Sequence, residues 1–146
     1  MAVSTPTEDI LARVELFSEL PRRDLARLAK AVVPRQFKKG DVIVREGDLG
    51  VAFYVVASGH VEVVKGLGEK EQVVAKLGPG DFFGEMSLFD NQVRSHSVRA
   101  VEDVECLILT KWDFNAELGA PSCRIALAML TILARRLRNL SDAATH

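Results

Sequence analysis

The stretch VAFYVVASGHVEVVK, residues 51–65, holds two runs of β-branched and aromatic residues separated by a Ser58-Gly59 pair. Such runs predict strands, and the Ser-Gly pair predicts a tight hairpin between them. Similar short apolar runs, cut by glycine turns, continue on both sides of this stretch. The predicted strands are Val42–Val44, Val51–Ala57, His60–Lys65, Gln72–Leu77, His96–Val101 and Glu105–Leu109. Their number and spacing predict a small antiparallel barrel or jelly roll over residues 36–110.

Helical periodicity precedes the strands. Ile10, Val14 and Phe17 recur at spacings of four and three, which is typical of one face of a helix. Pro21 suits the first turn of a second helix, because its missing N–H would have no intrahelical partner there. We therefore expect N-terminal helices over residues 8–33.

A long helix is predicted to close the fold. Residues 111–142 read as C-terminal helices, with Ser122 as N-cap of the longer one. An apolar seam at heptad spacing follows, made of Ala126, Leu130, Leu133, Leu137 and Leu140 and widened by Ile125, Met129 and Ile132. Two interpretations of this seam stay open: a helix packed on its own barrel, and a homodimer contact.

Composition agrees with one domain over residues 1–146. The chain is 48% hydrophobic and 27% charged, with a formal net charge of −1, so it can bury a core and stay in solution. A net charge near zero argues against a protein whose whole surface is basic and binds nucleic acid. No apolar run reaches the length of a membrane span, and the start is polar, so we expect a cytoplasmic protein. Cys106 and Cys123 are too few for a disulfide scaffold or a four-cysteine metal site.

The fold class is therefore α+β, mainly β: an antiparallel jelly-roll barrel, or double-stranded β-helix, between N-terminal helices and a long C-terminal helix.

One segment of that barrel, GPGDFFGEMSLF at residues 78–89, has the residue types of an anion-binding site. Glycines and a helical turn let backbone N–H groups converge on an anion. Arg94 lies nine residues after Glu85, and can return to the same anion with a bidentate guanidinium. Glu85 would repel a bare phosphate, so it suits a ligand that also offers a hydroxyl, as a ribose does.

This segment resembles the phosphate-binding cassette of the cyclic nucleotide-binding domain family. The resemblance rests on Phe83-Gly84-Glu85-Met86-Ser87-Leu88 followed by Arg94-Ser95, which places the cassette at residues 83–95. Upstream turns such as Glu46-Gly47-Asp48 also follow the family pattern, and the likeness covers about residues 10–142. It implies a non-enzymatic sensor of a cyclic nucleotide, cAMP or cGMP with cAMP favoured, without a metal or other cofactor.

The resemblance implies a role for each matching residue. Arg94 would pair with the exocyclic oxygens of the cyclic phosphate, and Glu85 would accept a hydrogen bond from the ribose 2′-hydroxyl. Gly84 would allow the ligand to approach closely. The expected ligand-binding residues are Phe83, Gly84, Glu85, Met86, Ser87, Arg94, Ser95 and Arg136. Asp81 is interpreted as a turn residue rather than a ligand contact.

Two positions outside the cassette also bear on the predicted ligand site. His96 stands where the family usually has a small residue; it could face the pocket or point outward. Leu133-Ala134-Arg135-Arg136-Leu137 resembles the C-helix of regulators of the cAMP receptor protein type. That resemblance implies that Arg136 approaches the base of the nucleotide, from the same chain or a dimer partner, while Arg135 and Arg138 are expected to be solvated.

Other functional classes fit the same residues less well. A cupin enzyme needs a His-x-His pair, which His60, His96 and His146 do not supply. A helix-turn-helix would have to follow the long helix, and little sequence remains after Leu140, so no direct nucleic-acid binding by this chain is expected. Three possibilities remain: a complete sensor, the sensor part of a longer regulator, kinase or channel, and a degenerate module that binds no nucleotide. In the sensor hypothesis, the ligand repositions the C-terminal helix.

Overall fold

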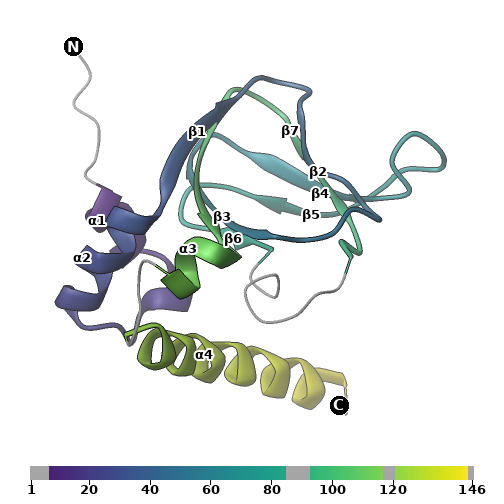
Figure 1. The fold of residues 1–146 in the computed structure, drawn as a ribbon. Helices are drawn as coiled ribbons and strands as arrows, with labels where there is room; N and C mark the ends of the chain where they lie inside the picture. The colour runs from purple at the N-terminus through teal and green to yellow at the C-terminus, as the bar shows by residue number, and fades with distance from the viewer. Residues whose placement is uncertain (1–6, 85–92, 117–120, 145–146) are drawn as a thin grey trace.

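Two antiparallel sheets form the barrel in the computed structural model, which describes residues 7–84, 93–116 and 121–144 (Figure 1). The first sheet has the strand order β1-β8-β3-β6 and the second has the order β2-β7-β4-β5. The strands are β1 (Val33–Phe37), β2 (Val42–Val44), β3 (Ala52–Ser58), β4 (Val61–Lys65), β5 (Gln72–Leu77), β6 (Phe82–Phe83), β7 (Ser97–Ala100) and β8 (Val104–Thr110). The predicted mainly-β jelly roll is confirmed.

The predicted hairpin at Ser58-Gly59 is wrong. β3 pairs with β6 and β8, whereas β4 pairs with β5 and β7, so the chain passes from one sheet to the other at this point. Gly59 has a φ of +82°, and a Cβ there would lie 2.9 Å from Cγ2 of Val104. The β7–β8 connection runs alongside, with the N–H of Val101 donating to the carbonyl of His60 at 3.1 Å. The pair therefore marks a bend between sheets, which local sequence does not distinguish from a hairpin turn.

Asp81 is a turn residue, as expected. Its carboxylate accepts a hydrogen bond from the N–H of Gly78 at 2.9 Å. Gly80, with a φ of +90°, donates its N–H to the carbonyl of Val56 at 2.9 Å. Asp41 forms the corresponding turn before β2, with the N–H of residue 38 donating to its carboxylate at 2.8 Å. The turn at Asp81 delivers the chain into β6, beside the candidate ligand pocket.

Five helical segments flank the barrel in the described part of the chain: α1 (Thr7–Ala12), η1 (Glu15–Phe17), α2 (Arg22–Ala31), α3 (Lys111–Ala116) and α4 (Pro121–Ala144). The N-terminal helices end at Ala31 instead of residue 33, because Val33 already pairs with Ile108 as the first residue of β1. Pro34 explains the difference, since it favours an extended conformation for the residue before it. β1 and β6 are strands that the sequence did not predict as such.

Strand β3 of the first sheet contributes side chains to the core on both of its faces. Phe53 and Val55 of β3 belong to a core shared with the helices, while Tyr54 and Val56 face the core between the sheets. The ring of Phe53 meets that of Phe17 edge to face, 5.7 Å between centroids. Burial on both faces explains why the sequence of β3 is continuously apolar rather than alternating.

α4 uses only part of its apolar seam for packing. Ile125, Met129 and Ile132 are buried in the core shared with the helices. Leu130 and Leu137 are 44% and 68% exposed. The helix therefore packs on its own chain through one stripe and leaves a second apolar stripe on the surface. No helix among the described residues has the length and apolar character that a membrane crossing requires.

Candidate ligand pocket

The candidate ligand site lies around the short strand β6. Phe83 pairs with Tyr54 of β3, and their rings stack at 4.8 Å between centroids with 5° between planes. Phe82 points to the opposite face, toward Phe53, at 5.9 Å between centroids. Successive residues of a strand point to opposite faces, so β6 contacts the barrel interior through Phe83 and the helical layer through Phe82.

Gly84 follows β6 and lies against Arg94. The Arg94 guanidinium donates to the carbonyl oxygen of Ala52 at 2.7 Å. A Cβ at Gly84 would collide with Arg94 Nη1 and lie 2.9 Å from the Ala52 oxygen. Gly84 also has a φ of +77°, a conformation that other residues adopt only with strain. Glycine is therefore required here on both steric and conformational grounds.

Backbone pairing holds Arg94 in place. Its N–H donates to the carbonyl of Asp48 at 2.7 Å, and its carbonyl accepts from the N–H of Gly47 at 2.8 Å. Leu49 and Val93 form an adjacent bridge. The Glu46-Gly47-Asp48 turn, noted in the sequence only as part of the family pattern, is thus the support of the arginine.

The guanidinium of Arg94 also faces an aromatic ring. Its Cζ lies 5.9 Å from the centroid of Tyr54. Burial raises the pKa of the Tyr54 hydroxyl, and the charge of Arg94 acts in the opposite direction. Phe83, Tyr54 and Arg94 therefore form one contiguous cluster in the candidate site, and Tyr54 is a member that the sequence did not identify.

Ser95 and His96 contact each other. The Oγ of Ser95 lies 2.8 Å from Nδ1 of His96, and the carbonyl of Ser95 accepts from Lys65 Nζ at 2.8 Å. Lys65 is also paired with Glu46 at 3.0 Å. Hydrogen bonds from Lys65 and from a backbone N–H lower the pKa of the Glu46 carboxyl. His96 is half-buried and lies beside Ser95, directly before β7.

Arg136 contacts β6 on the face that packs against the helices. Its Cζ lies 4.6 Å from the centroid of the Phe82 ring, and its Nε is 3.1 Å from Glu15 of η1. Arg135, expected to be solvated, is exposed and pairs with Glu19 at 2.9 Å. Both arginines therefore tie α4 to the N-terminal helical layer, and Arg136 additionally covers Phe82.

Three predicted site residues, Glu85, Met86 and Ser87, lie outside the described residues. The structure does bring together Phe83, Gly84 and Arg94, which are separated by up to eleven positions in the chain. No grouping of three or more His, Cys, Asp or Glu side chains suited to a metal ion occurs in the described ranges. Cys106 is buried, and burial raises the pKa of its thiol to about 12, which removes it as a nucleophile.

The structure is an antiparallel β barrel in which an arginine lies against a close-packed glycine at the end of β6, with a long C-terminal helix packed on the chain. Comparison with known proteins identifies the class. The cyclic nucleotide-binding domain family matches residues 34–119, and this chain belongs to that family.

Relatives and solved structures agree. The cyclic AMP receptor protein of Thermus thermophilus is 46% identical over 105 residues, covering 71% of this chain and 48% of that protein. The regulatory subunit of cAMP-dependent protein kinase from Dictyostelium discoideum is 34% identical, covering 77% of this chain and 36% of that protein. The chain thus spans about half or less of these relatives.

A solved structure matches over almost its full length. The crystal structure of the N-terminal domain of a transcriptional regulator from Streptomyces coelicolor superposes with a TM-score of 0.80 at 34% identity, covering 93% of this chain and 95% of that one. The Thermus thermophilus catabolite activator protein gives a TM-score of 0.76 at 39% identity, covering 90% and 62%. The expected fold and family are both confirmed.

Proposed function

We propose that this domain is a regulatory sensor that binds cAMP, in preference to cGMP, beside Arg94 and Gly84. The observation that carries the proposal is the contact between these two residues. An arginine has five N–H donors, and the bond to the carbonyl of Ala52 orients the guanidinium plane against β3. A cyclic phosphate is a single anion with two exocyclic oxygens, which suits bidentate pairing with such a plane.

The choice of ligand is supported by the relatives. The chain is 46% identical over the matched region to a protein named for cyclic AMP and 34% identical to a regulatory subunit of a cAMP-dependent kinase. Relatives named for cGMP also occur, at 33% identity. We expect Glu85 to accept from the ribose 2′-hydroxyl, the N–H groups of Met86 and Ser87 to face the phosphate or ribose, and Ser95 to donate as well. No catalytic step is assigned to the domain, and we expect it to work in the cytoplasm.

We infer that the signal leaves the pocket through α4. Arg136 covers Phe82, the residue before Phe83 and Gly84, so a ligand that moves the cassette changes the surface on which Arg136 rests. A ligand shifts such an equilibrium only by its difference in affinity for the two helix positions. The exposed stripe of Leu130 and Leu137 is suited to a homodimer contact that helix movement would present or withdraw.

The greater length of the relatives favours a second possibility, in which the same sensor is one domain of a longer protein. In the cyclic AMP receptor protein of Thermus thermophilus the matched part is 48% of the protein. The sensor would then act on further domains of a longer regulator.

A thermal-shift screen tests the proposed ligand. A ligand that binds only the folded state raises the unfolding midpoint by mass action. We expect cAMP to raise the midpoint most, cGMP less, and linear 5′-AMP or cyclic dinucleotides little. If no cyclic nucleotide raises it, the degenerate module is the better interpretation.

A further inference from the structure

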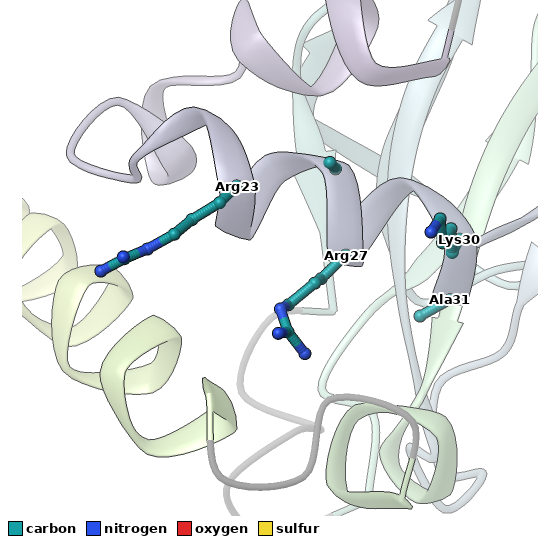
Figure 2. A pocket seen from close by; sticks show the side chains of 5 residues that line it. Arg23, Arg27, Lys30 and Ala31 are labelled. Atoms are coloured by element: carbon teal, nitrogen blue, oxygen red, sulfur yellow. The ribbon is translucent and has the colours of Figure 1, made fainter.

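One face of α2 carries three basic side chains. Arg23, Arg27 and Lys30 follow spacings of four and three, which place them on the same side of the helix. They are spread along about 10 Å of helix axis. All three are exposed, and with Ala26 and Ala31 they line a groove of about 470 Å³ (Figure 2). We call this groove, lined by Arg23, Ala26, Arg27, Lys30 and Ala31, the α2 basic groove.

The ion pairs of α2 in the described part of the chain lie beside the α2 basic groove and not in it. Arg22, next to the groove, pairs with Glu8 at 3.1 Å and with Asp9 at 3.6 Å. No comparable ion pair to Arg23, Arg27 or Lys30 occurs among the described residues. A cluster of three exposed cations therefore stands on a chain whose net charge is −1.

The helix that carries the cations is firmly anchored. Leu25 and Leu28, on the opposite face of α2, are buried in the core shared with the helices. Figure 2 shows Arg23 and Arg27 projecting from one side of the helix. The backbone of the groove is thus held in place by packing, while the basic side chains reach into solvent.

We propose that the α2 basic groove docks an acidic segment of another polypeptide. Two arginines one turn apart present planar donor forks, which match carboxylates in a bidentate manner. Ala26 and Ala31 are small, so the partner's backbone can approach the helix between the basic side chains. The partner fits as a short run of Asp or Glu, helical or extended, with carboxylates at intervals of about one helical turn.

Nucleic acid fits the groove less well. Non-specific binding to a single strand combines a basic track with aromatic side chains on which bases stack, and none of the described lining residues is aromatic. The affinity for a duplex grows with the number of phosphates that Lys and Arg neutralise, and the groove offers only three cations among its described residues. An acidic polypeptide is therefore the better match.

Fluorescence anisotropy with a labelled peptide tests the proposal. The probe is a twelve-residue peptide of alternating Glu and Ala, and the same peptide with Gln for Glu is the neutral control. The full chain should bind the Glu peptide more tightly than the Gln peptide, with an affinity that falls as salt rises. The double variant R23E/R27E should weaken Glu-peptide binding by about tenfold or more, because attraction becomes repulsion at two contacts. R23K/R27K should retain part of the affinity.

A matched control separates the groove from net charge. K70E/K76E makes the same change in charge near the β4–β5 hairpin, on the far side of the barrel from α2 (Figure 1). We expect this variant to bind the Glu peptide within about threefold of the parent chain, because screening is strong over that distance. Equal losses in both double variants would overturn the proposal.

Two further measurements complete the test. A single-stranded oligo-dT with the same number of charges as the peptide should bind more weakly than the peptide; tighter binding that depends on Arg23 and Arg27 would reassign the groove to nucleic acid. Titration with cAMP should give the same affinity in R23E/R27E and the parent chain, since neither Arg94 nor Gly84 lines the α2 basic groove. Nucleotide binding and peptide docking therefore succeed or fail separately.

Discussion

The guanidinium of Arg136 lies over the ring of Phe82, with 4.6 Å between Cζ and the ring centroid. This contact joins α4 to β6 across the layer of core that separates the helices from the barrel. The same guanidinium pairs with Glu15 of η1. One side chain thus touches the C-terminal helix, the N-terminal helical layer and the strand that leads into the candidate pocket.

Replacing Arg136 with alanine should uncouple α4 from the pocket. We expect a change in unfolding free energy of about 1 kcal/mol or less, because the ion pair with Glu15 is exposed and the ring contact is single. Hydrogen exchange in α4 should respond less to saturating cAMP than in the parent chain. Arg135→Ala is the matched control, since it loses an exposed ion pair with Glu19 but no ring contact. Equal responses in the two variants would contradict the coupling.

Replacing Arg94 with alanine should cost about 2–5 kcal/mol of cAMP affinity, because the phosphate charge would lose its partner in a partly desolvated site. Titration calorimetry measures the loss. Arg13→Ala removes one exposed arginine that directly follows α1, and it should leave the affinity unchanged. Retention of parent-like affinity in the Arg94 variant would refute the pocket assignment.

Gly84→Ala should destabilise the fold more than Gly40→Ala. Both glycines have positive φ, +77° and +90°, and each alanine should cost about 1–2 kcal/mol for that conformation alone. A Cβ at Gly84 also meets Arg94 and Ala52, whereas a Cβ at Gly40 meets nothing within 4 Å. Chemical denaturation of the two variants isolates the steric part, and only Gly84→Ala should also weaken cAMP binding. Equal destabilisation would show that the pocket yields to the extra methyl group.

Two aspartate substitutions in α4 should distinguish the residues that stabilise the fold from those that form a homodimer contact. Leu137 is 68% exposed and Ile132 is 4% exposed. Leu137→Asp should change the unfolding free energy by about 0.5 kcal/mol or less while weakening any homodimer. Ile132→Asp should destabilise the domain by about 3 kcal/mol, because it buries an unpaired charge. Denaturation and sedimentation velocity make the two measurements; a dimer that survives Leu137→Asp would place the interface elsewhere.

Cys106 should be unreactive in the folded domain. Its pKa is raised to about 12 by burial, with a smaller contribution from Glu105, against about 8.5 for an exposed thiol. In a Cys123→Ser background, alkylation by iodoacetamide near pH 8 should be far slower in the native state than in denaturant. Because the folded pKa is the higher one, this thiol's contribution to stability is complete below about pH 8.5 and is lost as the pH rises toward 12. Rapid native labelling would contradict the burial.

Much of the barrel was predictable because its strands are short apolar runs between glycines. Val42–Val44 and Gln72–Leu77 were predicted with the observed bounds. β6 was not, because two residues are too few for a periodic pattern and its pairing with Tyr54 and Val55 is non-local. The bend at Gly59 was mistaken for a hairpin for a similar reason: a positive φ suits both, and only the partners of β3 and β4 distinguish them.

The candidate site also contains some residues that the sequence predicted and others that only the structure identified. The cassette motif alone predicted Gly84 and Arg94, since their chemistry and spacing are local properties. Tyr54 and Ala52 could not be found, because they join the site through strand pairing and a backbone carbonyl. The role of Arg136 over Phe82 needed the packing of α4 on the helical layer.

The sequence by itself determined that this chain is a mainly-β barrel with a long apolar helix, and it contains a motif that resembles a phosphate-binding cassette. Those features follow from residue type and spacing, which act over a few neighbours. Only the tertiary structure decided that Ile125, Met129 and Ile132 take the buried stripe of α4 and leave Leu130 and Leu137 outside. Residue type cannot make that choice, because all five side chains are apolar and the rotation of a helix is set by the shape of the core it packs against.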